Sequence, residues 1–128
     1  MKKPLLFLFL FTIGFAASAQ TGYISNLPPS QFKTAMEGEK NKKLIDVRQD
    51  WEFAKGHLAN AVNIDAMADD FEKKIGEIPR DTPLYIYCYS GGRSAEAAEK
   101  MKAMGFKKVV NMTGGISAWE KALLPVVK

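Results

Sequence analysis

Short apolar runs alternate with amphipathic stretches along most of this chain of 128 residues. Apolar runs rich in Val, Ile, Leu and Tyr are typical of buried strands, and the amphipathic stretches are typical of helices packed on a sheet. This alternation predicts an α/β fold with a central, mainly parallel sheet flanked by helices on both faces. The predicted strands are 44–47, 62–64, 84–87 and 109–110, and the predicted helices are about 28–38, 50–55, 69–75, the stretch after Arg93 that stops at Gly105, and 116–123.

The helix predicted after Arg93 has one continuous apolar face. Helical spacing brings Ala95, Ala98, Met101 and Met104 to the same side. We expect this side to pack against the sheet.

The first residues differ in composition from the rest of the chain. Two lysines precede an almost wholly apolar run over 5–15, and Ala17-Ser18-Ala19 then has the small-x-small pattern of a processing site. This order is typical of a secretory signal peptide, and the run is shorter than the roughly 18 residues of a membrane-spanning helix. We expect a signal peptide over 1–19, one domain over 20–128 and an exported protein, periplasmic or secreted, that is free of the membrane after cleavage.

Composition and charge fit a single globular domain without a nucleic-acid partner. The chain is 47% hydrophobic and 25% charged, which suits one compact core. Subtracting the two signal-peptide lysines from the 18 basic residues leaves 16 against 14 acidic ones, a formal charge of +2. The lysines form short, scattered groups, whereas nucleic-acid binding requires a basic stripe or face.

Cys88, the only cysteine, is the best candidate for a reactive group. It follows the apolar run 84–87 and precedes a glycine-containing segment, an order that predicts a strand, a loop and a helix N-terminus. Backbone N–H groups at a helix N-terminus lack intrahelical partners and carry the positive end of the helix dipole. We expect them to favour the thiolate and to lower the pKa of Cys88 into the range of about 3.5 to 7.5.

The residues after Cys88 supply an anion-binding geometry. Gly91 and Gly92 can adopt positive φ without steric cost, which lets successive N–H groups converge above the sulfur. Arg93 adds a charged donor fork suited to an oxyanion with more than one oxygen. The alternative is a buried structural thiol before an ordinary turn, and the glycines and the arginine make that alternative the weaker one.

Three segments resemble signatures of the rhodanese-like domains, the thiosulfate sulfurtransferase family. The family's active-site loop resembles Tyr87-Cys88-Tyr89-Ser90-Gly91-Gly92-Arg93-Ser94. Its upstream signature resembles Leu44-Ile45-Asp46-Val47-Arg48 followed by Trp51-Glu52-Phe53, Gly56-His57-Leu58 and Ala61-Val62-Asn63-Ile64. Its closing signature resembles Asn111-Met112-Thr113-Gly114-Gly115-Ile116, ending in Trp119, so the resemblance extends from about Ile24 to Pro125.

The resemblance implies a sulfurtransferase that uses Cys88. The thiolate would attack the outer sulfur of thiosulfate or a related sulfane donor, release sulfite and hold the sulfur as a persulfide for cyanide or a thiol to accept. Arg93 would neutralise the donor's sulfonate, and a protein is a further candidate donor or acceptor. This chemistry requires neither a metal nor an organic cofactor. The remaining substrate-binding residues would be Tyr89, Ser90, Gly91 and Gly92.

Other polar residues are expected to support the loop rather than to react. The supporting residues are Asp46, Arg48 and Ser94. Asp46 ends a predicted strand and is expected to accept hydrogen bonds from the loop, whereas Arg48 is expected to pair with Asp50 or Glu52. His57, the only histidine, has no ligand set around it in the sequence and is interpreted as structural.

Two other functions are compatible with a cysteine in such a loop. Cysteine-based phosphatases and arsenate reductases have five residues between cysteine and arginine, whereas four separate Cys88 from Arg93. The shorter loop suits one sulfur atom better than a tetrahedral oxyanion. An exported persulfide carrier or binding module that turns over poorly alone would have the same sequence, so that alternative stays open.

Overall fold

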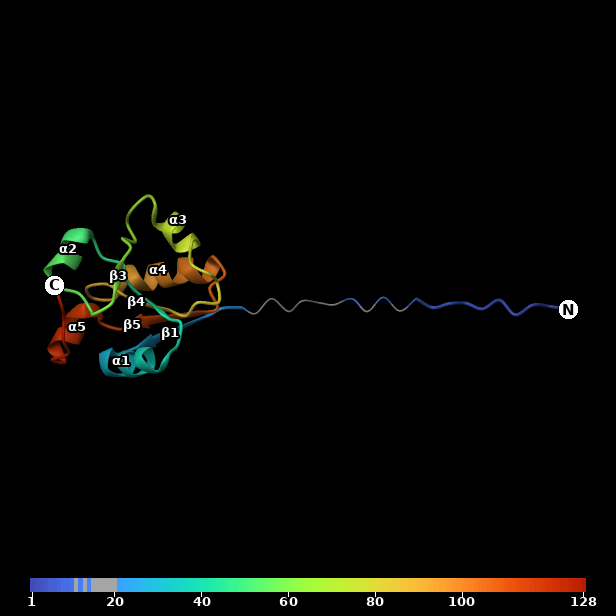
Figure 1. The fold of residues 1–128 in the computed structure, drawn as a ribbon, viewed down its shortest axis with the longest axis horizontal. Coiled ribbons are helices and arrows are strands. Elements are labelled where there is room, and N and C mark those ends of the chain that lie inside the picture. The colour runs from blue at the N-terminus through green and yellow to red at the C-terminus, as the bar shows by residue number, and fades with distance from the viewer. Residues whose placement is uncertain (11, 13, 15–20) are drawn as a thin grey trace.

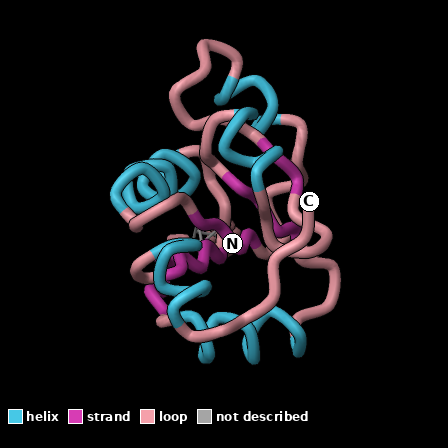
Figure 2. Tube along the Cα trace, turned by 90° about the vertical axis from the view of Figure 1, so that its left-hand side faces the viewer, coloured by secondary structure: helices cyan, strands magenta, loops and turns pink. Residues whose placement is uncertain are grey.

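The computed structural model describes residues 1–10, 12, 14 and 21–128. Within these residues, one sheet of five parallel strands has the order β1-β5-β4-β2-β3, with helices on both faces (Figures 1 and 2). The strands are β1 (Tyr23–Leu27), β2 (Lys43–Asp46), β3 (Val62–Asn63), β4 (Leu84–Tyr87) and β5 (Lys108–Met112). The helices are α1 (Pro29–Gly38), α2 (Asp50–Lys55), α3 (Phe71–Gly76), α4 (Gly92–Ala103) and α5 (Gly115–Lys121).

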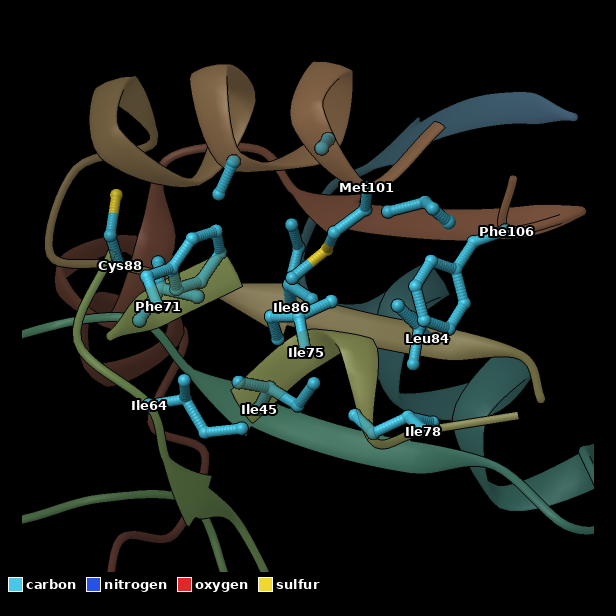
Figure 3. Packing of buried hydrophobic residues seen from close by; sticks show 14 residues of the cluster. Ile45, Ile64, Phe71, Ile75, Ile78, Leu84, Ile86, Cys88, Met101 and Phe106 are labelled. Atoms are coloured by element: carbon cyan, nitrogen blue, oxygen red, sulfur yellow. The ribbon is translucent and has the colours of Figure 1, made fainter. Parts of the chain in front are cut away.

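Each face of the sheet has its own apolar core, because successive strand residues point to opposite faces. On the face of α3 and α4, Ile45 and Ile86 pack with Phe71 and Met101, and Cys88 lies at the edge of the same cluster (Figure 3). On the opposite face, residues of α1 and α5 cover the alternate strand positions. That second cluster includes Phe32, Leu44, Tyr85, Tyr87, Val110 and Trp119. The predicted α/β architecture is confirmed.

The predicted helices and strands agree with the observed ones to within two residues at each end, but β1 was not predicted. β1 lies at the edge of the sheet, pairs only with β5, and contains no fully buried residue. Its polar residues Ser25 and Asn26 interrupt the apolar pattern that marks the central strands. Edge strands are solvated on more sides and therefore leave a weaker pattern.

The inward face of α4 differs from the prediction by one position. Ala95 is exposed, so its assignment to the buried face is wrong. The buried residues of α4 are Ser94, Ala97, Ala98 and Met101. The helix is turned so that the hydroxyl of Ser94, rather than the methyl group of Ala95, lies near Cys88.

The expected cleavage site at 17–19 lies outside the described residues. Residues 1–10 form neither helix nor strand and are exposed. In the part of the chain that the structure describes, no helix has both the length and the apolar character needed to cross a membrane.

Tyr87, the last residue of β4, joins the sheet to the segment that follows α2. Its hydroxyl accepts a hydrogen bond of 3.0 Å from the Leu58 amide, and both residues are buried. Burial is the main cause that raises the pKa of Tyr87, and the Asp46 charge adds to it. The hydroxyl therefore stays neutral and available at every physiological pH.

We expect Tyr87→Phe to destabilise the domain by about 1–3 kcal/mol, because the buried Leu58 N–H loses its acceptor. Denaturant unfolding of the domain measures this change. The control is Tyr23→Phe on the exposed side of β1, for which a change within about 0.5 kcal/mol is expected. Equal effects of the two substitutions would contradict the assigned role of the Tyr87 hydroxyl.

Candidate active site

The candidate site lies where β2 and β4 end, at the carboxyl edge of the parallel sheet. Asp46 is the last residue of β2, and Cys88 directly follows β4. The two strands are paired, with Asp46 opposite Tyr87. Ligand sites of open parallel sheets lie at this edge, so the topology brings together the two segments that the sequence pattern singled out.

The Cys88 sulfur accepts two hydrogen bonds from the start of α4. The Gly91 amide donates at 3.0 Å and the Ser94 hydroxyl lies 3.2 Å from Sγ. Donors of this kind stabilise a thiolate more than a thiol. The expectation of an amide-stabilised sulfur is thus supported, with one backbone and one side-chain donor rather than a complete ring of amides.

Gly91, but not Gly92, adopts the positive φ expected of the loop. Gly91 has φ +110° and is the N-cap of α4, whereas Gly92 is the first helical residue. The expectation of positive φ at both glycines is therefore wrong at Gly92. The helix begins at Gly92, before the predicted start after Arg93, so only residues 89–91 form a loop. The N–H of Gly91, the N-cap, points toward the sulfur.

Cys88 is buried, with 1% of its surface exposed. In Figure 3 its side chain points toward the first turn of α4, and Phe71 lies beside it. A donor molecule therefore reaches the sulfur only when the groups that cover it move aside. Ser90 and Tyr89, both exposed, are the part of the loop that meets solvent.

The start of α5 holds the loop from the other side. The Ile116 amide donates to the Cys88 carbonyl at 2.9 Å, and the Ser117 amide donates to the Tyr89 carbonyl at 3.0 Å. Gly115, with φ +61°, makes this approach possible, because a Cβ there would lie 2.4 Å from the Tyr89 carbonyl oxygen and 2.5 Å from that of Cys88. Gly115 of the closing signature thus allows α5 to hold the backbone of Cys88 and Tyr89.

Arg93 forms a bidentate ion pair with Glu52 of α2. Its two terminal nitrogens lie 2.7 and 3.0 Å from the two carboxylate oxygens. The hydrogen bonds from Arg93 lower the pKa of Glu52, and those to Glu52 are the main cause that raises the pKa of Arg93. Arg93 lies between Gly91 and Ser94, the two residues that donate hydrogen bonds to the Cys88 sulfur. Sequence reasoning assigned Arg93 to the site but missed Glu52.

Asp46 and Arg48 form a buried ion pair with each other. Asp46 Oδ1 and Oδ2 accept four hydrogen bonds from the Arg48 backbone and guanidinium, and Arg48 Nη2 also donates to the Gly56 carbonyl at 2.7 Å. Burial opposes the charged form of Arg48, but the hydrogen bonds and charge of Asp46 outweigh it and raise the Arg48 pKa. Among the residues that the structure describes, the expected hydrogen bonds from the Cys88 loop to Asp46 are not found, because its carboxylate is occupied by Arg48. The expected pairing of Arg48 with Asp50 or Glu52 is wrong, because the arginine folds back onto the end of its own strand.

A groove of about 360 Å³ lies beside the loop. Trp51 and Tyr89 line it with large exposed aromatic rings, 55% and 54% accessible. The other lining residues are Arg48, Glu52, Lys55, Gly56, Ile116 and Glu120. Tyr89 of the loop and Trp51 of α2 therefore form the exposed aromatic surface of this groove.

The remaining expectations concern metals and His57. Among the residues that the structure describes, no group of three or more potential metal ligands comes together. His57 stacks on Phe53 with ring centroids 3.7 Å apart, and its Nδ1 lies 3.0 Å from the Phe53 carbonyl oxygen. These contacts agree with the structural interpretation of His57.

Comparison with known proteins identifies a family for this arrangement. A family model described as Rhodanese-like domain matches residues 28–122. The chain is 33% identical over 87 residues to the thiosulfate sulfurtransferase GlpE of Shewanella oneidensis, an alignment that covers 68% of this chain and 84% of that protein. A rhodanese-related protein of Thermoplasma volcanium has a similar structure, with a TM-score of 0.67 and 31% identity over 82% of this chain and 98% of that one.

A further relative is longer than this chain. The Bacillus subtilis protein YrkF, named as a sulfur carrier protein, is 33% identical over 111 residues, which are 87% of this chain but 59% of YrkF. The chain thus spans less than two thirds of that relative's length. A relative named as a thiosulfate sulfurtransferase and one named as a sulfur carrier protein therefore have the same identity to this chain.

We expect Gly115→Ala to destabilise the domain by about 1–3 kcal/mol and to slow the reactions of Cys88, because the new methyl group displaces the Cys88 and Tyr89 carbonyls. Thermal unfolding and the rate of Cys88 alkylation measure the two effects. Gly38→Ala at the end of α1 is the matched control, since a Cβ there meets no atom within 4 Å. A Gly115→Ala variant with unchanged alkylation would show that α5 does not position the sulfur.

Proposed function

Since this chain belongs to the family of rhodanese-like domains, we propose that it is a sulfurtransferase that carries sulfane sulfur on Cys88 as a persulfide. The observation that carries the proposal is the pair of hydrogen bonds to the Cys88 sulfur from Gly91 and Ser94. A thiolate is the nucleophilic form of cysteine, and these donors favour it at the N-terminus of α4.

The proposed reaction has two steps. The Cys88 thiolate attacks the outer sulfur of thiosulfate, a new S–S bond forms, and the bond between the two donor sulfurs breaks with its electron pair leaving on sulfite. A thiophilic acceptor, cyanide or a thiol, then attacks the outer sulfur of the persulfide and releases the Cys88 thiolate. The donors from Gly91 and Ser94 stabilise the sulfur anion in both resting forms.

The proposed role of Arg93 is to balance the charge that develops on the sulfonate of the donor. Arg93 lies in the first turn of α4, between the two residues that donate to the Cys88 sulfur, but its guanidinium is engaged with Glu52. A sulfonate therefore has to compete with the Glu52 carboxylate for the same nitrogens.

We propose an exported location for the enzyme, supported by the lysines, apolar run and small residues that begin the sequence.

A persulfide carrier is the second candidate function. The 1% exposure of Cys88 and the resemblance to the carrier YrkF favour it. In that case a protein partner would open the loop and deliver the sulfur, and turnover with small donors would be slow. The two functions share the persulfide and differ in the rate at which small molecules load it.

We expect the protein to gain the mass of one sulfur atom when it is incubated anaerobically with thiosulfate, and to lose that mass with dithiothreitol. Intact-mass spectrometry detects the change, and Cys88→Ser is expected to gain nothing. Thiocyanate formation in the presence of cyanide then measures turnover. An unchanged mass together with thiocyanate formation no faster than in buffer would exclude a thiosulfate sulfurtransferase and favour the carrier.

We expect Arg93→Ala to lower kcat/KM for thiosulfate by about tenfold, because a charge-assisted contact to the sulfonate is lost. Alkylation of Cys88 by a neutral reagent is expected to slow less than turnover does. Parallel losses in the two assays would show that Arg93 mainly holds the loop in place.

A further inference from the structure

Both arginines beside the candidate site are already paired with carboxylates. Arg48 is paired with Asp46, and Arg93 is paired with Glu52. The Arg93–Glu52 pair is partly shielded, with 30% of the arginine side chain and 14% of the glutamate side chain exposed. Neither guanidinium therefore offers an unpaired charge to a dianion that approaches Cys88.

Glu52 is held in place by its own helix. It lies in the first turn of α2 and takes part in a capping box with Gln49, whose backbone N–H lies 3.4 Å from Glu52 Oε1. The far end of α2 is fixed by the hydrogen bond from Arg48 to the Gly56 carbonyl. An incoming anion would have to break a bidentate pair in which the carboxylate is anchored, which is more costly than displacing a mobile side chain.

The groove next to Glu52 is larger than a thiosulfate ion needs and is not a basic pocket. Trp51 and Tyr89 provide exposed aromatic surface, and the remaining charges in the lining are one cation, Lys55, and one acid, Glu120. Aromatic surface with charges of both signs suits an organic molecule that carries ammonium and carboxylate groups. It offers little to a small inorganic dianion.

We propose that Glu52 is a specificity-determining residue that directs this site toward organic hydropersulfides, whose carbon portion lies in the groove of Trp51 and Tyr89, and away from thiosulfate. This inference rests on the proposed persulfide function and narrows its donor. Glu52 acts through Arg93, by occupying the nitrogens that a sulfonate requires.

The donor step balances without a further reactant. The Cys88 thiolate attacks the terminal sulfur of R–S–SH, the new S–S bond forms, and the bond between the two donor sulfurs breaks. The electron pair leaves with R–S⁻, and the proton stays on the transferred sulfur. The departing thiolate carries a single negative charge, so it needs no doubly charged binding site, in contrast to sulfite.

The test compares how fast two donors load Cys88 with sulfur. Freshly prepared glutathione hydropersulfide and thiosulfate are mixed with the protein anaerobically, and the persulfide is followed by rapid quench and intact-mass spectrometry. The wild type is expected to load at least about tenfold faster, at equal subsaturating concentration, from the hydropersulfide. Glu52→Gln is expected to shift the ratio of the two rates by about tenfold toward thiosulfate.

Two further variants make the test specific. Glu99→Gln removes an exposed carboxylate in the second half of α4 and is expected to leave the donor ratio as in the wild type. Trp51→Ala is expected to raise the half-saturating concentration of glutathione hydropersulfide severalfold more than that of thiosulfate, because only the organic donor contacts the ring.

The outcomes separate this inference from the proposed function. If neither donor adds sulfur to Cys88, the proposed function fails. If Cys88 gains sulfur but the wild type loads faster from thiosulfate, the inference alone is overturned, and this result does not depend on the folding of any variant. A Glu52→Gln protein that is folded by circular dichroism and keeps the wild-type donor ratio overturns it as well.

Discussion

The geometry of the site depends on the contact between the start of α5 and the carbonyls of Cys88 and Tyr89. These carbonyls lie just beyond β4, where the sheet no longer pairs them, and the amides of Ile116 and Ser117 bind them instead. Gly115 allows the two backbones to approach, because no side chain intervenes. The backbone of Cys88 is therefore placed by two segments that are distant in sequence, so its position is established only when β4, β5 and α5 have assembled.

Around this fixed backbone, charge is balanced pair by pair. The carboxylates of Asp46 and Glu52 each neutralise one arginine, so the sulfur is stabilised mainly by a backbone amide and a hydroxyl. Such dipoles stabilise an anion at short range without a net positive field. Both arginines beside the candidate site are thus paired with carboxylates, and in the proposed function the choice of donor depends on the surface around the loop.

The apolar pattern was sufficient to predict the central strands, the helices and the position of Cys88 between β4 and α4, because burial on both sides produces continuous apolar runs. It failed for β1, which is an edge strand, and for Ala95, because the rotation of α4 is set by its tertiary contacts. The pairing of Arg93 with Glu52 joins residues far apart in the chain, and no local spacing encodes it. The Gln49-x-x-Glu52 spacing is that of a capping box and fits Glu52 to the start of α2, but it does not identify Glu52 as the partner of the loop.

The burial of the sulfur has a consequence for its oxidation chemistry. The chain contains a single cysteine, so a sulfenic acid formed on it has no neighbouring thiol with which to form a rescuing disulfide. Burial protects the thiol in another way. A bulky disulfide does not reach the Cys88 side chain, because α4 and Phe71 cover it. The same burial that limits the access of a donor to the sulfur thus also limits the access of oxidants.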